Sequence, residues 1–167
     1  MNFIIEPLSK EKAQDFLILC EKIDQESNFM LLEKGERNTG IMEAERLVSD
    51  ISQLKVIVFV AQINDKIIGY ILGIKNKIER QKHIISFSMG VVNEYQKNNI
   101  GSLLIDKMIE YSIQNSIKRI ELTVRTDNDK AIRLYKRKGF EIEGTKKSSI
   151  FTNNKFYDEF MMSKLIE

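Results

Sequence analysis

The sequence predicts an α/β (α+β) protein in which a mixed β-sheet carries helices on both faces. Two observations support this fold class. The spacing of hydrophobic residues changes repeatedly along the chain between a helical and a strand-like period. A strand, a helix and a second strand also follow one another from about Phe87 to Val124, the pattern of a βαβ unit. The length of 167 residues, with 43% hydrophobic and 30% charged residues, is typical of one domain covering residues 1–167.

The first third of the chain is expected to be mainly helical. A short apolar strand, Phe3–Glu6, is followed by Pro7, which can end it. Apolar residues at helical spacing predict a helix from about Lys10 to Gln25. The segment Ser27–Gly40 is irregular, and a second helix is expected from about Met42 to Ser52.

The middle of the chain is expected to form three strands. Lys55–Gln62 and Lys66–Ile74 are rich in β-branched residues and are separated by an Asn64–Asp65 turn. In the third strand, at about His83–Val92, apolar residues alternate with serine and glycine, so one face is apolar and the other small.

The helical period returns after Asn99, where an amphipathic helix is expected. The remaining elements are a strand, a helix and two strands, expected at Ile120–Val124, Asp127–Lys138, Phe140–Glu143 and Phe156–Leu165. Gly139 directly follows the last of the helices, as a C-terminal glycine should.

Composition argues against several classes of protein. A net charge of +2 does not imply a broad nucleic-acid-binding surface. The lone Cys20 rules out an intrachain disulfide, is best interpreted as a core residue, and leaves no Cys/His cluster for a metal. No secretory signal or membrane span is recognisable, so we expect a cytoplasmic protein with no membrane partner.

The stretch from Val91 to Leu104 carries the clearest chemical signal. A strand leads into a polar loop, and the loop leads into the N-terminus of a helix, whose first N–H groups lack internal partners. Such a loop can hold a phosphate or pyrophosphate. It lacks the Gly-x-x-x-x-Gly-Lys-Ser/Thr spacing of a nucleotide triphosphate loop, which disfavours nucleotide hydrolysis.

This loop resembles the coenzyme A pyrophosphate loop of the GNAT N-acetyltransferase superfamily, Gln/Arg-x-x-Gly-x-Gly/Ala. The chain has Gln96 and Gly101 in place, with Asn99 where glycine is usual. Asn tolerates positive φ better than most residues, so the substitution is physically mild. The segment Leu122–Glu141, with Asn128, Ala-Ile, Leu-Tyr and Gly-Phe, resembles the second cofactor segment of the same family. The tail from Gly144 resembles a C-terminal hairpin common in the superfamily, and Phe29-Met30, Glu36 and Arg80–His83 resemble one bacterial branch.

The resemblance implies a mostly antiparallel sheet with a splayed parallel pair, and acetyl-CoA or coenzyme A as cosubstrate. Backbone N–H groups near Val91 and Val92, where a bulged strand would separate from its neighbour, would hold the thioester carbonyl. The implied cofactor-binding residues are Val91, Val92, Gln96, Lys97, Asn98, Asn99, Ile100, Gly101, Ser102, Asn128 and Tyr135. Gln96 and Lys97 can also be read as solvated loop residues, and Asn128 as only a helix cap.

Tyr135 lies on the apolar face of its expected helix, so packing alone would bury it. The resemblance implies a further role, in which the phenol is a general acid that protonates the departing thiolate. The general base is open. His83, the chain's one histidine, is a candidate but is equally well a strand-end residue, and Glu36 and Glu33 in the irregular segment are others. The strand from Ile84 to Val92 offers no carboxylate.

The expected function is acetyl transfer from acetyl-CoA to a primary amine, with a small molecule such as an amino acid or a polyamine as the preferred acceptor. A protein N-terminus is the alternative acceptor. A coenzyme A-binding sensor or structural subunit without turnover is the alternative from another class, supported by Asn99 and the missing strand carboxylate. The resemblance also favours a homodimer.

Overall fold

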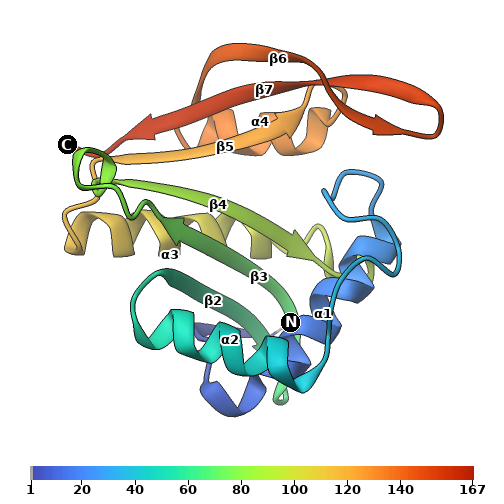
Figure 1. Cartoon of the computed structure of the whole chain (residues 1–167), viewed down its shortest axis with the longest axis vertical. Helices are drawn as coiled ribbons and strands as arrows, with labels where there is room; N and C mark the ends of the chain where they lie inside the picture. The colour runs from blue at the N-terminus through green and yellow to red at the C-terminus, as the bar shows by residue number, and fades with distance from the viewer. Residues whose placement is uncertain (1) are drawn as a thin grey trace.

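In the computed structural model, which describes residues 2–167, seven strands form one sheet in the order β1-β2-β3-β4-β5-β7-β6 (Figure 1). Every neighbouring pair is antiparallel except β4 and β5, which confirms the predicted mixed sheet with one parallel pair. The strands are β1 (Ile4–Pro7), β2 (Val56–Ile63), β3 (Lys66–Lys75), β4 (Ile84–Val91), β5 (Arg119–Arg125), β6 (Glu141–Thr152) and β7 (Lys155–Leu165). The α-helices are α1 (Ala13–Glu26), α2 (Ile41–Ser52), α3 (Ile100–Gln114) and α4 (Asp129–Arg137).

Helices cover both faces of the sheet, as the sequence predicts, and each face has its own core. On one face α1 and α2 enclose a cluster that includes Phe16, Cys20 and Tyr70. Burial there raises the pKa of the Cys20 thiol to about 12, in keeping with a core residue. On the opposite face α3 and α4 pack on a larger cluster that includes Leu104 and Met108. Within residues 2–167, no helix combines the length and the apolar character needed to cross a bilayer.

Most predicted elements match the structure to within two residues at each end, and two differ by more than that. The first helix opens with a separate 3-10 turn, Lys10–Lys12, before α1 begins. The strand predicted over Phe140–Glu143 is only the start of β6, which continues to Thr152 and turns back at Asn153. Most β6 side chains are exposed at the sheet edge, so the strand has no buried face. Without a buried face there is no alternating hydrophobic pattern for the sequence to reveal.

The two parallel strands pair at one end only. Their register runs from Ile84 opposite Arg119 to Ser86 opposite Glu121 and then stops. Beyond Ser86 the strands diverge, and Figure 1 shows the gap widening toward the end of β4 that leads into α3. The gap left by this splay is about 16 Å long, at ~3.3 Å per residue from Ser86 to Val91. The splayed pair implied by the family resemblance is therefore present.

The splay does not arise from a bulge in β4. Pairing of β4 with β3 runs without a register shift from Lys75 opposite Ile85 to Gly69 opposite Val91. The expectation of a bulged strand near Val91 is therefore wrong. The described sheet has its register shifts elsewhere, between β2 and β3 and between β6 and β7. The strands separate because β5 turns toward β7, with which it pairs along its whole length.

Candidate active site

The predicted cofactor loop has the backbone that its sequence suggests. Asn99 precedes α3 with φ 62° and ψ 8°, and Lys97 also has a positive φ of 68°. Asn is one of the few residues that adopt this left-handed conformation readily, which explains how it replaces glycine here. The Asn99 side chain does not cap the helix. The N–H groups of Ile100, Gly101 and Ser102 therefore have no partner within α3, and the positive end of its dipole is available to an anion.

Side chains of the loop hold the loop itself. The Gln96 amide donates to the carbonyl oxygen of Val91 at 3.1 Å, and its own oxygen accepts from Lys130 at 2.6 Å. The Asn98 amide donates to the Tyr95 carbonyl at 3.1 Å. The side chains of Gln96 and Asn98 thus stabilise the loop, and the backbone N–H groups at the start of α3 remain among the donors available to a ligand.

The backbone of β4 directs alternate N–H groups to its two neighbours. Val92 N–H donates to the Ile68 carbonyl at 3.0 Å, so it is already used by the sheet. The register of β4 with β3 then turns the N–H groups of Val91 and Met89 the other way, into the gap beside β5. Of the two N–H groups predicted to hold the thioester carbonyl, that of Val91 faces the gap and that of Val92 does not.

Tyr135 lies at the vertex of the splay. Its ring packs edge-on against Phe87 with centroids 5.9 Å apart, and Phe87 is the first β4 residue beyond the pairing with β5. Tyr135 is 9% exposed, and burial raises the pKa of its phenol to about 12. The phenol therefore keeps its proton at neutral pH. Asn128 caps the helix that carries Tyr135, with its side-chain oxygen accepting from Ala131 N–H at 3.2 Å.

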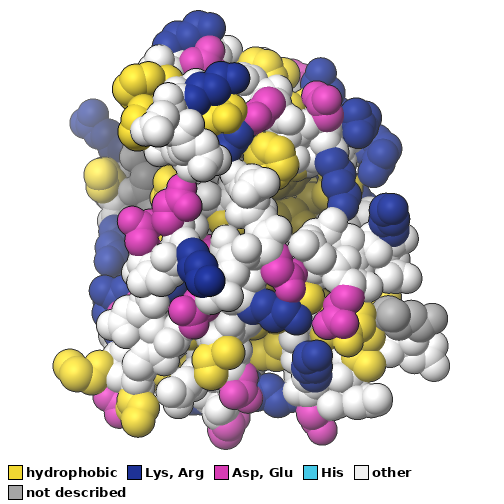
Figure 2. All heavy atoms as spheres, turned by 90° about the vertical axis from the view of Figure 1, so that its right-hand side faces the viewer, with side chains coloured by type: hydrophobic (Ala, Val, Ile, Leu, Met, Phe, Trp, Pro, Cys, Tyr) yellow, Lys and Arg dark blue, Asp and Glu magenta, His cyan; other side chains and the backbone are white. Residues whose placement is uncertain are grey.

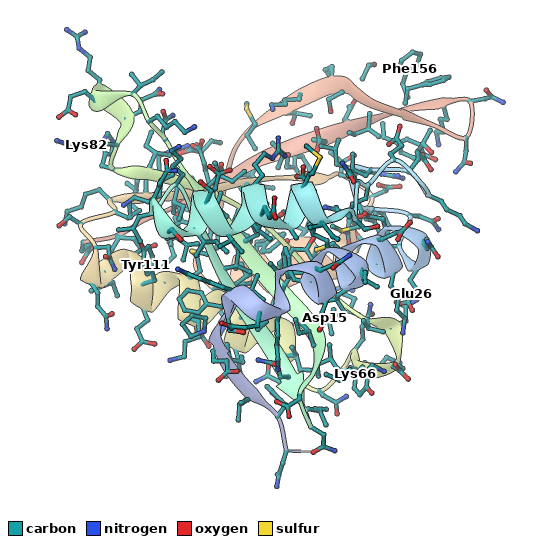
Figure 3. All side chains as sticks on the ribbon, turned by 60° about the horizontal axis from the view of Figure 1, so that its bottom comes forward. Asp15, Glu26, Lys66, Lys82, Tyr111 and Phe156 are labelled. Carbon is teal, nitrogen blue, oxygen red and sulfur yellow. The ribbon has the colours of Figure 1, made fainter. Side chains whose placement is uncertain are left out.

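His83 is not brought to this site. It precedes β4 at the paired end of the two strands, where its carbonyl accepts from the N–H groups of Lys118 and Arg119. At ~3.3 Å per residue it is about 26 Å along the strand from Val91. In Figure 3 the adjacent Lys82 lies on the opposite side of the molecule from Phe156, which is on the β6–β7 hairpin. The structure thus places His83 at the end of the strand, as one of its two interpretations has it, and away from the gap beside Val91.

The segment 27–40 and the β6–β7 hairpin meet at the open end of the splay. Glu33 accepts a hydrogen bond from the Thr152 hydroxyl at 2.6 Å, which joins the two. Glu36 accepts the Glu33 N–H at 2.8 Å and so stabilises its own turn. The Glu33 and Glu36 carboxylates are thus both near the open end of the gap between β4 and β5, which we call the mouth. Each already accepts a hydrogen bond there. Figure 2 faces this side and shows a hollow with hydrophobic side chains inside and Lys and Arg side chains along one rim.

A carboxylate that sequence reasoning missed lies on the sheet itself. Glu121 is opposite Ser86 at the last position of the parallel pairing, and both line a cavity of about 340 Å³. Its carboxylate accepts from Arg119 at 2.8 Å. Beyond this point the side chains of Ser88 and Thr123 are exposed, so this face is open between the diverging strands. Only the register of β4 with β5 reveals that Glu121 is beside the gap.

The residues present fit a coenzyme A diphosphate. The start of α3 offers N–H groups without a partner in the helix, and the positive φ values of Lys97 and Asn99 turn the backbone of the preceding loop into the helix. The part of the chain that the structure describes contains no group of three or more His, Cys, Asp or Glu side chains that could hold a metal ion.

Comparison with known proteins agrees with this geometry. The model of the acetyltransferase (GNAT) family matches residues 20–140. The L-amino acid N-acetyltransferase AaaT of Escherichia coli is 34% identical over 107 residues, which cover 64% of this chain and 66% of AaaT. The N-acetyltransferase MJ1207 of Methanocaldococcus jannaschii is 34% identical over 86 residues, covering 50% of this chain and 38% of that protein. The chain thus spans less than two thirds of these curated relatives.

Solved structures extend the likeness to the whole fold. An acetyltransferase of the GNAT family from Streptococcus pneumoniae superposes with a TM-score of 0.90 at 28% identity, covering 99% of this chain and 100% of that one. A phosphinothricin acetyltransferase from Sinorhizobium meliloti, solved with acetyl-CoA, has a TM-score of 0.87 at 15% identity, covering 99% and 89%. At that identity the second likeness concerns the fold alone. With a family model matching most of its length, the chain belongs to the GNAT acetyltransferase family.

Proposed function

We propose that the protein transfers an acetyl group from acetyl-CoA to a primary amine by direct attack. The observation that carries this proposal is the juxtaposition of three features at one gap. Met89 and Val91 direct N–H groups into the splay, Tyr135 stands at its vertex, and the uncapped α3 begins where β4 ends. Together they would provide an oxyanion site, a proton donor and a diphosphate site at one gap.

Bound acetyl-CoA supplies an activated carbonyl carbon, and the residues of this chain hold it and move protons. The N–H groups of Met89 and Val91 donate to the carbonyl oxygen, which gains negative charge as the amine nitrogen bonds to the carbon. Tyr135 donates its phenolic proton to the sulfur while the carbon–sulfur bond breaks. The amine proton passes to a base. The products are an amide and a free thiol, and the Tyr135 phenolate recovers a proton from solvent.

For the base we compare two carboxylates. Glu121 lies on the open sheet face where β4 and β5 part, and its second carboxylate oxygen is left over after the bond to Arg119. Glu36, expected from the sequence, is on segment 27–40 and holds the turn of that segment. Proximity to the gap favours Glu121, because a general base must reach the reacting nitrogen directly or through one water.

A small amine, and within that class a free amino acid, is the proposed acceptor. The AaaT relative is named for acetylating L-amino acids, which supports this choice. The hydrogen bond between Glu33 and Thr152 also joins segment 27–40 to the β6–β7 hairpin at the mouth, where a longer peptide would have to enter. This contact favours a small acceptor over a peptide. A protein N-terminus is the second candidate. A cytoplasmic location stays a proposal, and a homodimer stays one on the family resemblance alone.

The deciding experiment measures thermal stability and thiol release together. Coenzyme A should raise the melting temperature, because a ligand that binds only the native state stabilises it, whereas ATP and NAD should not. Thiol release from acetyl-CoA should then depend on an added amine, with mass spectrometry showing the acetylated product. A melting shift without amine-dependent thiol release, over a panel of amino acids, polyamines and peptides, would instead support a sensor without turnover.

A further inference from the structure

Arg125, at the end of β5, is a buried arginine with an unusually complete set of contacts. Its side chain is 8% exposed. The Nε and Nη2 groups donate to the two Asp127 oxygens at 3.0 and 2.7 Å, and Nη1 donates to the carbonyl oxygen of Asn28 at 2.8 Å. The guanidinium also lies over two aromatic rings, 3.7 Å from the centroid of Tyr157 and 5.0 Å from that of Phe29.

These contacts join parts of the chain that are distant in sequence. Asn28 and Phe29 begin the segment 27–40, Tyr157 is on β7 in the hairpin, and Asp127 is next to the residue that caps α4. The segment and the hairpin are the two walls that meet at the open end of the splay. Arg125 therefore lies between both walls of the mouth and fixes each of them to the end of β5.

The charge of Arg125 is already compensated. Asp127 takes two of its N–H groups in a bidentate pair, and Arg125 in turn holds the pKa of Asp127 below its usual value. The third contact ends on a backbone carbonyl. A planar guanidinium with these partners is suited to fixing geometry between two aromatic rings, and poorly suited to binding an acceptor carboxylate.

We infer that Arg125 is a positioning residue for the acceptor amine, acting through the segment 27–40 and the β6–β7 hairpin. This inference rests on the proposed function, and it assigns the acceptor site to the space between these two walls. Loss of the guanidinium should loosen the walls against each other and weaken acceptor binding. Within residues 2–167, none of the hydrogen bonds, ion pairs or cation–π contacts of the Arg125 side chain reaches the loop before α3 or α3 itself, so the affinity for acetyl-CoA should be unaffected.

Two variants and one control test this role. Arg125→Gln removes the charge and the planar fork, whereas Arg125→Lys keeps the charge but lacks the fork that pairs with both Asp127 oxygens while also reaching Asn28. The control is Lys138→Gln, which removes another partly buried ion pair. Lys138 directly follows α4 and donates to both carboxylate oxygens of Asp106 on α3 at 2.6 Å, and none of its hydrogen bonds within residues 2–167 reaches either wall. Lys138→Gln therefore shows how far the loss of a partly buried ion pair lowers stability when neither wall of the mouth is changed.

The kinetic measurement uses the free L-amino acid that the wild type acetylates fastest. Both Arg125 variants should raise the KM for that amine roughly 10–100-fold, the scale set by misplacing a bound reactant, and leave the KM for acetyl-CoA within about twofold. Lys138→Gln should leave both constants unchanged. If Arg125→Lys behaves as the wild type, charge alone suffices and the positioning role is refuted. An equal rise in both KM values for the Arg125 variants would also refute it.

A second measurement does not depend on catalysis. Amide hydrogen exchange should become faster in residues 27–40 and in the hairpin of Arg125→Gln, relative to Lys138→Gln at matched stability. Unchanged exchange in both walls overturns the inference even if the protein proves to be an active acetyltransferase. Faster exchange in a protein that acetylates no amine leaves the anchoring by Arg125 intact while refuting both the acceptor role and the proposed function, so the two failures are distinguishable.

Discussion

The rings of Tyr135 on α4 and Phe87 on β4 meet edge to face, with centroids 5.9 Å apart and planes at 75°. Phe87 is the first β4 residue that is no longer paired with β5, so the contact lies where the two strands begin to separate. Phe140 completes the cluster, with its centroid 6.0 Å from that of Tyr135. Packing thus accounts for the ring of Tyr135. The hydroxyl needs a separate explanation, because a phenylalanine would satisfy the same aromatic contacts.

Replacing Tyr135 by Phe tests that explanation. If the phenol protonates the leaving thiolate, turnover should fall roughly 10²–10⁴-fold, the range of a lost general acid, while the affinity for acetyl-CoA is kept. The substitution removes one oxygen and keeps the ring contacts, so the melting temperature should change little. Steady-state kinetics with the best amine, beside a melting curve, are sufficient. Unchanged turnover would remove Tyr135 from the mechanism and leave the cofactor site untouched.

The backbone at Asn99 gives a prediction about cofactor binding. With φ at 62°, Asn99→Gly should preserve the thermal shift that coenzyme A produces, because glycine adopts this conformation freely. Asn99→Val should abolish the shift, because a β-branched residue resists positive φ at a cost of roughly 1–2 kcal/mol or more. The melting temperature of each variant without ligand is the control. A full shift in Asn99→Val would mean that the loop binds the cofactor in another conformation.

A three-strand contact at the paired end of the splay predicts how stability depends on pH. Arg119 on β5 forms a bidentate ion pair with Glu143 on β6, and the Ser163 hydroxyl of β7 donates to the same carboxylate at 2.6 Å. These partners lower the pKa of Glu143 to about 2. A carboxylate with a depressed pKa in the folded state stabilises above its unfolded value of ~4.3 and loses this contribution as pH falls toward 2.

The variant Glu143→Gln should therefore be less stable than the wild type at pH 7 and should lose less stability than the wild type between pH 5 and 2. Urea unfolding at each pH measures the difference in the free energy of unfolding. Glu141→Gln is the matched control, since Glu141 begins the same strand, is exposed, and has no ion-pair partner among residues 2–167. If the free energy of unfolding depends on pH in the same way for Glu143→Gln and the wild type, Glu143 is not the source of the acid-dependent loss of stability.

Local chemistry explains what could be predicted from the sequence. The positive φ of Asn99, the cap at Asn128 and the burial of Tyr135 depend on neighbouring residues along the chain. The use of Val92 N–H depends instead on pairing with Ile68, and the remoteness of His83 depends on where β4 meets β5. Such register is set by long-range contacts that no sequence period encodes.

Arg125 illustrates the same limit. In the sequence it is one residue of the second cofactor segment, with no pattern that singles it out. Its partner Asn28 is 97 residues away, and the aromatic rings come from two further elements. An exposed arginine and a buried bridging arginine have the same sequence signature, so only the fold distinguishes them.

The carboxylate that accepts the amine proton can be identified with two glutamine substitutions. Glu121→Gln keeps the size of the side chain and can still accept from Arg119, but it cannot take up a proton, so turnover should fall at least roughly 10²-fold. Glu36→Gln keeps an acceptor for the Glu33 N–H and should leave turnover within about twofold. The pH dependence of turnover separates a lost base from lost structure, because a lost base removes the acidic limb of the profile. If Glu121→Gln retains both turnover and the acidic limb of the profile, Glu121 is not the general base. If Glu36→Gln instead loses both, Glu36 is the residue that accepts the amine proton.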